Sequence, residues 1–166
     1  MPHEEIVAAL DARGVEFEIA IENTLRDYNM GTIVRSANAF GVRTLHIVGR
    51  RQWNRRGAMM TEKYLDVLHH DSPEHFARYM HDRGRTIVAV DNVPGATLLQ
   101  HADIGRRVVL VFGQEGPGIS AEFLKHCQHI VAIEQLGSTR SINVGVAAGI
   151  VMYEMLRRNY LVAGHR

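Results

Sequence analysis

The spacing of apolar residues along the chain predicts an alternation of strands and helices. Strands are expected at residues 16–21, 44–48, 64–68, 86–90, 107–112 and 129–133. The segments 86–90 (TIVAV) and 107–112 (RVVLVF) are continuous apolar runs, which are typical of strands covered on both faces. The segment 16–21 (EFEIAI) instead alternates polar and apolar residues, a pattern that predicts a strand.

Helices are expected between these strands, at residues 3–12, 30–40, 73–84, 120–127 and 141–156. Capping residues support several of these starts, because Asn29, Ser72 and Ser120 each precede a helical pattern. Gly41 is the expected end of the second helix. The alternation predicts an α/β fold with a mainly parallel sheet and helices on both faces.

Composition indicates a single domain of ordinary globular type. The chain has 166 residues, of which 46% are hydrophobic and 22% charged, and it contains no linker or repeat. We expect one domain over residues 1–166, with a short N-terminal segment at about residues 1–20. No apolar run approaches the roughly 18 residues that cross a bilayer, and the acidic N-terminus lacks a signal-peptide profile. The expected location is therefore cytoplasmic, with no membrane association.

Cysteine and histidine give no sign of a disulfide or a metal site. Cys127 is the only cysteine, which excludes an internal disulfide. His126, Cys127 and His129 are close in sequence, but no second cluster has the spacing of metal ligands. We expect no metal, and we place Cys127 at the edge of the core.

Three of the predicted strands are followed by loops rich in glycine and polar residues. These loops are residues 91–95 (DNVPG), 113–120 (GQEGPGIS) and 134–141 (EQLGSTRS). Parallel sheets bind ligands beyond the carboxyl ends of their strands, so the loops form a candidate ligand site. Neither GxGxxG nor GxxxxGK(S/T) occurs in the required place, which argues against an ordinary pyrophosphate cradle. The alternative is that the loops are tight turns with glycine at positive φ.

The start of the last predicted helix is crowded with polar side chains, among them Ser141 and Asn143. Either residue can cap the unpaired amide groups of the helix or offer hydrogen bonds to a ligand. Small residues follow at Gly145, Ala147 and Ala148, and they allow the helix to lie close to another backbone.

Three stretches match one family when they are taken together. They are residues 29–42 (NMGTIVRSANAFGV), 108–120 (VVLVFGQEGPGIS) and 140–154 (RSINVGVAAGIVMYE). In order and spacing they resemble the three motifs of the SpoU, or TrmH-like, RNA 2′-O-methyltransferases of the SPOUT superfamily. The resemblance implies S-adenosylmethionine as methyl donor and a ribose 2′-hydroxyl in tRNA or rRNA as acceptor. It also implies a deep C-terminal trefoil knot, which is the SPOUT fold, and a homodimer.

The resemblance also implies a catalytic centre and a cofactor site, position by position. The catalytic residues would be Asn29, Arg35, Glu115, Ser141 and Asn143. The cofactor-binding residues would be Val90, Asp91, Asn92, Gly113, Ile133, Leu136, Ser141 and Val144. A carboxylate at Glu115 would repel RNA phosphate, so a structural role is expected for it, and Asn29 is expected to orient Arg35 or to contact RNA.

Arg35 carries most of the expected chemistry. At about 100° per residue, it lies about 150° from the centre of the apolar stripe of its helix, so it points away from the local core. A guanidinium group stays protonated in proteins and is a poor base. We therefore expect Arg35 to hold the target phosphate and to stabilise the emerging 2′-alkoxide, while the proton leaves through phosphate or water. A solvated surface arginine is the alternative that the pattern alone favours.

Positive charge is concentrated in one loop, although the formal net charge is only +1. We call residues 49–60 (GRRQWNRRGAMM) the arginine-rich loop. Its four arginines can bind phosphates, and its tryptophan can stack on an exposed base. The predicted RNA-binding residues are therefore Arg35, Arg50, Arg51, Trp53, Arg55 and Arg56. The alternatives are solubilising loop charge for the arginines and partial burial for Trp53.

Two other functions remain open beside the methyltransferase. One is a non-catalytic RNA-binding dimer with a degenerate cofactor site, against which the presence of all five motif residues argues. The other is a different α/β nucleotide enzyme, against which the missing phosphate motifs argue.

Overall fold

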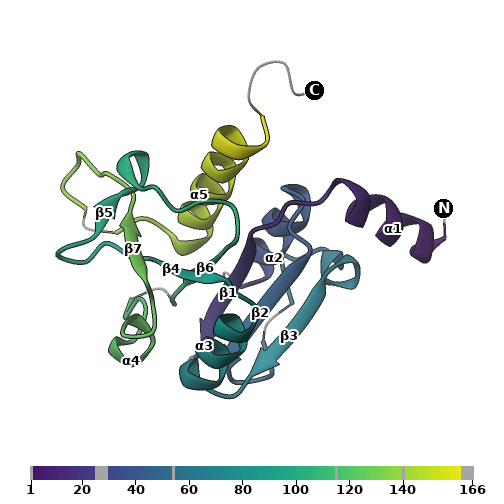
Figure 1. Cartoon of the computed structure of the whole chain (residues 1–166), viewed down its shortest axis with the longest axis horizontal. Coiled ribbons are helices and arrows are strands. Elements are labelled where there is room, and N and C mark those ends of the chain that lie inside the picture. The colour runs from purple at the N-terminus through teal and green to yellow at the C-terminus, as the bar shows by residue number, and fades with distance from the viewer. Residues whose placement is uncertain (1, 25–29, 54, 115, 140, 162–166) are drawn as a thin grey trace.

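A seven-stranded parallel sheet forms the centre of the molecule (Figure 1). The computed structural model describes residues 2–24, 30–53, 55–114, 116–139 and 141–161. The strands are β1 (Glu18–Asn23), β2 (Thr44–Gly49), β3 (Asp66–His70), β4 (Thr86–Val90), β5 (Thr97–Leu98), β6 (Val108–Phe112) and β7 (His129–Ala132). Their order in the sheet is β3-β2-β1-β6-β4-β7-β5, and all the pairings between these strands are parallel. The predicted parallel α/β architecture is confirmed, and the knot stays a prediction.

Helices cover both faces of the sheet, as predicted. They are α1 (His3–Arg13), α2 (Met30–Ala39), α3 (Pro73–Asp82), α4 (Ala121–Leu124) and α5 (Val144–Asn159), with short 3-10 turns η1 (Thr61–Tyr64) and η2 (Leu99–His101). Helices α2 and α5 pack together on one face, and α3 and α4 lie on the other. Helix α1 buries none of its residues and projects from the sheet at the N-terminal end (Figure 1).

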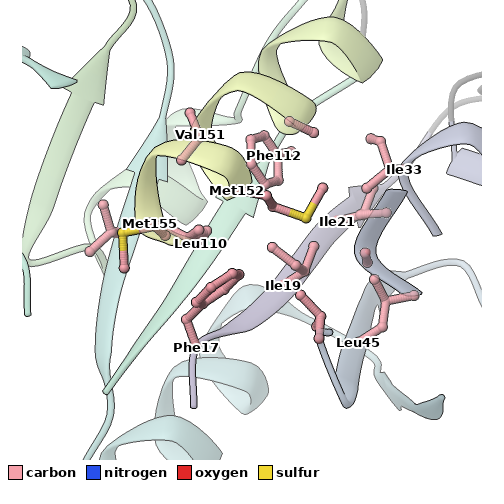
Figure 2. Close-up of a cluster of buried hydrophobic side chains, with 14 of the residues drawn as sticks. Phe17, Ile19, Ile21, Ile33, Leu45, Leu110, Phe112, Val151, Met152 and Met155 are labelled. Carbon is pink, nitrogen blue, oxygen red and sulfur yellow. The ribbon is translucent and has the colours of Figure 1, made fainter. Parts of the chain in front are cut away.

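The core consists of two apolar layers, one on each face of the sheet. Alternate residues of a strand point to opposite faces, so Ile19 of β1 enters the layer under α2 and α5, and Ala20 enters the layer under α3 and α4. Figure 2 shows Met152 and Met155 of α5 pointing toward the strands that carry the first layer. Burying both faces explains the continuous apolar runs of β4 and β6.

Most element boundaries agree with the sequence. Ser72 caps α3, because its hydroxyl accepts a hydrogen bond from the His75 N–H at 3.1 Å, and Gly41 follows α2 with a φ of +84°. Strands β1 and β3 begin two residues later than predicted, and α4 is shorter. Strand β5 was not predicted, because two residues are too few to show a period.

Strand β1 carries charged residues between apolar ones, but none of them faces solvent. All of its residues are buried, including Glu18 and Glu22. The Glu18 carboxylate lies 2.6 Å from His46 Nε2 of β2 and 3.0 Å from Nε of Arg85, the residue directly before β4, so these paired groups compensate for its burial. The alternation therefore reflects buried polar contacts rather than exposure to solvent.

The last helix begins later than the predicted Ser141. Helix α5 starts at Val144, and Asn143 is its cap, with Oδ1 accepting a hydrogen bond from the Val146 N–H at 3.2 Å. Ser141 consequently lies in the preceding loop. Cys127 is half-buried beside the second layer, as expected for the edge of the core, and burial raises the pKa of its thiol to about 12, with the Glu22 carboxylate adding to the effect.

A chain of histidines runs from the surface into the sheet. His75 Nδ1 lies 3.3 Å from His70 Nδ1, and His70 Nε2 lies 2.9 Å from His46 Nδ1. Burial first, and the neighbouring His46 second, lower the pKa of His70 from 6.5 to about 4. The folded protein therefore keeps His70 neutral where an unfolded chain would protonate it.

We expect this histidine to weaken the fold in acid. Between pH 6.5 and 4 the unfolded chain binds a proton at His70 and the folded chain does not, so the free energy of unfolding falls as pH falls, by at most about 3 kcal/mol. Urea denaturation at several pH values checks this for the wild type and His70→Gln. As pH falls from 6.5 to 4, the free energy of unfolding of the wild type should fall more than that of His70→Gln. The variant His101→Gln, at an exposed histidine, should follow the wild type at every pH. A constant difference for His70→Gln would contradict the account.

Candidate active site

A cavity lies at the carboxyl ends of β4, β6 and β7, where Val90, Phe112 and Ala132 end their strands. We call it the strand-end cavity. The loops after these three strands and the first turn of α5 form its walls, as expected for a parallel sheet. Its lining residues are Val90, Asp91, Asn92, Phe112, Gly113, Gln114, Gly116, Gly118, Ala132, Ile133, Gln135, Ser141, Ile142, Val144 and Ala147.

The predicted cofactor residues converge on this cavity, with one exception. Val90, Asp91, Asn92, Gly113, Ile133, Ser141 and Val144 all line it. Leu136 does not, and its side chain is 93% exposed. Its role in cofactor binding stays a prediction.

The glycines of residues 113–120 fold this loop tightly against itself. A Cβ on Gly113 would lie 2.3 Å from the carbonyl carbon of Gly118, and the Gly118 N–H donates to the Gln114 carbonyl at 2.9 Å. Gly116 and Gly118 have φ values of +93° and +69°, which favour glycine. The tight-turn interpretation therefore holds for these two positions, and the turn forms one wall of the cavity.

Asp91 ties two walls of the cavity together. Its carboxylate accepts a hydrogen bond from the Ile119 N–H at 3.2 Å, across from β4 to the loop after β6. Asp91 is also the one ionisable side chain among the described lining residues, which include no lysine, arginine or histidine. Much of the remaining lining is apolar, including Phe112, Val144 and Ala147.

This lining limits the chemistry of a ligand. A pyrophosphate needs cationic side chains or converging amides, and the described walls offer no cation. An apolar surface with a few amide, hydroxyl and carboxylate groups suits a flat nucleoside that carries no phosphate. A ligand with positive charge would meet the Asp91 carboxylate without repulsion.

The structure describes three of the five predicted catalytic residues, and they do not all line the strand-end cavity. Arg35 is exposed on α2, on the side away from buried Ile33, Val34 and Ala37, so its predicted direction is confirmed. Ser141 lines the strand-end cavity, and Asn143 caps α5 beside it. The other two predicted catalytic residues, Asn29 and Glu115, lie outside the described residues.

The arginine-rich loop lies against the helix that carries Arg35. A Cβ on Gly31 of α2 would lie 2.0 Å from the Arg56 carbonyl oxygen, so only glycine allows this contact. The side chains of the four loop arginines are exposed. Trp53 is partly buried against the core, and the Arg55 guanidinium carbon lies 5.3 Å from its ring centroid. The partial burial of Trp53, which was the alternative to stacking on a base, is therefore observed. The predicted RNA-binding surface lies next to α2.

Several lining residues were missed by sequence reasoning. Gln114 and Gln135 lie in the predicted loops, but both side chains are neutral and the family resemblance assigns neither of them a role. Ala147 could have been found, because it lies one helical turn after Val144 on the same face of α5. Within the described ranges, no group of three or more histidine, cysteine, aspartate or glutamate side chains could hold a metal ion. No described helix is long and apolar enough to span a bilayer.

Comparison with known proteins gives a consistent result. The model of the SpoU rRNA Methylase family matches residues 16–153. An uncharacterized tRNA/rRNA methyltransferase from Mycobacterium ulcerans is 30% identical over 164 residues, which make up 95% of this chain and 52% of that protein. A similar protein from Mycolicibacterium paratuberculosis is 31% identical over 84% of this chain and 47% of its own length. The chain thus spans about half the length of these curated relatives.

Solved structures share the fold. The TrmH/SpoU tRNA modifying enzyme of A. aeolicus superposes with a TM-score of 0.82 at 26% identity, over 94% of this chain and 81% of that one. An AdoMet-bound rRNA methyltransferase from Sinorhizobium meliloti gives 0.77 at 26% identity, over 90% and 60%. A structure described as giving insight into the 2-OH methylation of C/U34 on tRNA gives 0.76 at 25% identity, over 87% and 96%.

Proposed function

Because the chain belongs to the SpoU rRNA Methylase family, we propose that it methylates RNA with S-adenosylmethionine as methyl donor. The observation that carries the proposal is the lining of the strand-end cavity. S-adenosylmethionine joins a nucleoside without phosphate to a positively charged sulfonium, and the cavity offers apolar walls, one carboxylate and no cationic side chain among the described residues. The AdoMet-bound relative from Sinorhizobium meliloti supports the same ligand.

Each part of the cavity has a distinct task in this proposal. When bound, S-adenosylmethionine supplies an electrophilic methyl group. The apolar residues Val90, Phe112 and Val144 hold the nucleoside and exclude water. Ser141 and Gln135 provide polar groups at the wall, and Asp91 keeps the loop of residues 113–120 in place. The acceptor must then lie in line with the methyl group, so positioning of the RNA is the main requirement that remains.

We further propose that the acceptor is a ribose 2′-hydroxyl and that the RNA is a tRNA. The relative concerned with 2-OH methylation on tRNA is matched over 96% of its length, and the A. aeolicus tRNA modifying enzyme over 81%, which supports both points. The rRNA methyltransferase is matched over only 60% of its length.

In this proposal Arg35 holds the phosphate beside the target ribose and stabilises the charge that develops on the 2′-oxygen, because its guanidinium donates hydrogen bonds but does not accept a proton.

Titration calorimetry tests the cofactor. S-adenosylmethionine should bind, and NAD⁺ should not, because the described walls lack cationic partners for a pyrophosphate. Binding of NAD⁺ alone would favour a different nucleotide enzyme. Binding of tRNA with no binding of S-adenosylmethionine would favour the non-catalytic RNA-binding dimer.

The homodimer is proposed on a separate observation. Val146, Ile150 and Tyr153 of α5 are 55%, 41% and 52% exposed, and their spacing places them on one face of the helix. Together with Leu99 and Ile133 they form the apolar part of a groove, which we call the α5 groove and which Gln100, Glu134, Gly149 and Glu154 also line. Ile133 also lines the strand-end cavity. Exposed apolar patches of this kind mark interaction surfaces, and we propose a second copy of the chain as the occupant.

Substituting Ile150→Glu should weaken the dimer by at least about 100-fold, because association would bury a charge in an apolar contact. Analytical ultracentrifugation over a concentration series measures the change. The matched control is Val67→Glu on β3, where the valine is exposed. Strand β3 is at the opposite edge of the sheet from β5 and β7, which precede the groove residues Leu99 and Ile133, so the dimer should persist. A monomeric wild type, or a dimer unchanged by Ile150→Glu, would contradict this interface.

A further inference from the structure

The carboxyl end of β1 carries three consecutive polar residues, Glu22, Asn23 and Thr24, and each side chain bonds a different partner. Strand β1 lies between β2 and β6. Its end is therefore placed between the arginine-rich loop, which follows β2, and the cavity wall, which follows β6. Glu22 and Asn23 are only 4% and 2% exposed. Buried polar groups cost stability unless they are bonded, so their partners indicate what these positions hold in place.

Asn23 holds the start of the arginine-rich loop. Its amide Nδ2 donates to the Arg50 carbonyl at 2.7 Å and to the Gln52 carbonyl at 2.9 Å. The Arg50 N–H in turn donates to the Asn23 carbonyl at 2.7 Å. Three hydrogen bonds thus fix the backbone of residues 50–52, on which two of the exposed arginines are carried.

The close approach of the loop depends on Gly49. This residue has a φ of +113°, and a Cβ on it would lie 2.6 Å from the Asn23 carbonyl oxygen. The backbone therefore turns directly over Asn23 at the point where β2 ends. Both hydrogens of the Asn23 amide are used by this loop, so its geometry is specific for an amide donor.

Thr24 holds a wall of the strand-end cavity. Its hydroxyl donates to Gln114 Oε1 at 2.7 Å, and its backbone N–H donates to the same oxygen at 3.1 Å. Gln114 is only 3% exposed and lines the cavity, and its carbonyl receives the Gly118 N–H that closes the glycine turn. Thr24 consequently fixes the side chain that lies between the cavity and β1.

Glu22 bonds the far end of the same loop. Its carboxylate accepts hydrogen bonds from the Ser120 N–H at 2.8 Å and from the Ser120 hydroxyl at 2.6 Å. Ser120 also caps α4. Residues 114 and 120 are thus both anchored by hydrogen bonds at the carboxyl end of β1.

We infer that Asn23 and Thr24 are positioning residues for two different ligands, Asn23 for RNA through the arginine-rich loop and Thr24 for the cofactor through Gln114. The inference rests on the proposed function, which supplies the two ligands. Neither residue acts on the reacting atoms. Because Asn23 ends β1 and Thr24 follows it directly, the backbone at this strand end sets the distance between the RNA-binding surface and the strand-end cavity.

The test compares one conservative variant at each position. Asn23→Asp keeps the shape but replaces the donor with a carboxylate that faces two carbonyl oxygens, so binding of unmodified bulk tRNA should weaken by about tenfold or more. The dissociation constant for S-adenosylmethionine should stay within about twofold. Thr24→Val removes one donor from Gln114 and should show the reverse pattern, with cofactor binding weakened by roughly fivefold and tRNA binding unchanged. Fluorescence anisotropy measures tRNA binding, and calorimetry measures cofactor binding.

A second variant at position 23 separates the loss of the amide donors from misfolding and from the added negative charge of Asn23→Asp. Asn23→Ala removes the donors without adding a negative charge, so it should weaken tRNA binding in the same selective way. A purely structural role would move both dissociation constants together with the melting temperature. Equal effects of each variant on both ligands, or no effect of either, would overturn the inference. If the wild type binds neither ligand, the proposed function fails and the inference fails with it. If the wild type binds both ligands, the variants test the inference alone.

Discussion

The Arg35→Lys variant is expected to lose methyl transfer by at least about 100-fold in kcat, while its affinity for S-adenosylmethionine stays unchanged. Lysine keeps the positive charge but replaces the planar fork of donors with a single ammonium group. If Arg35 holds a phosphate and the developing alkoxide at once, one ammonium cannot reproduce both contacts. Arg35 is exposed and is not among the residues that line the strand-end cavity, so folding and cofactor binding have no reason to change.

Single-turnover methylation with saturating cofactor measures this effect separately from binding. Arg78→Lys is the matched control, because Arg78 is an exposed helical arginine on α3 whose partner is Glu74 at 3.6 Å. It should methylate at the wild-type rate. A near-normal rate for Arg35→Lys would show that only the charge matters, and it would remove the two-contact role that we propose for this residue.

The Ala147→Leu variant is expected to weaken S-adenosylmethionine binding by at least about 100-fold, because the added carbons occupy the strand-end cavity. Ala147 lies in the first turns of α5, one turn after Val144, and both residues line that cavity. The larger side chain enters space that a ligand would fill, so the free energy of unfolding should change by only about 1 kcal/mol. Calorimetry and urea denaturation measure the two quantities.

The control for this variant is its neighbour on the same helix. Val146→Leu adds one carbon at a residue that is 55% exposed and lines the α5 groove rather than the strand-end cavity. Its cofactor affinity should match the wild type. Unchanged binding in Ala147→Leu would mean that the ligand does not enter the strand-end cavity, and the assignment of that cavity would be wrong.

The sequence predicted the fold well where local patterns decide the structure. Strand β4 occupies the predicted residues, and Ser72 caps its helix as expected, because continuous apolar runs and caps depend on neighbours in the chain. The burial of Glu18 in β1 could not be predicted, because its partners, His46 of β2 and Arg85 directly before β4, are far away in sequence. Local alternation cannot distinguish a solvated carboxylate from one that is buried beside a histidine and an arginine.

Part of the candidate site could likewise be predicted from the sequence, and part of it depends on contacts between distant residues. Parallel strands have their carboxyl ends at one edge of the sheet, so the convergence of the three polar loops could be predicted from the parallel direction of the strands. The anchoring of the cavity wall could not, because Thr24 and Gln114 are ninety positions apart and both have ordinary polar side chains. The start of α5 shows a related ambiguity, since Ser141 and Asn143 are both good caps and only the structure shows that Asn143 has this role.

The central claim is that this chain methylates the ribose of an RNA. Incubation with labelled S-adenosylmethionine and either unmodified bulk tRNA or unmodified rRNA, followed by digestion to nucleosides, tests it most directly. The account predicts a labelled 2′-O-methylnucleoside from the tRNA, and label from rRNA alone would correct only the RNA class. Label on a base, or no label in either RNA together with no cofactor binding, would contradict the account.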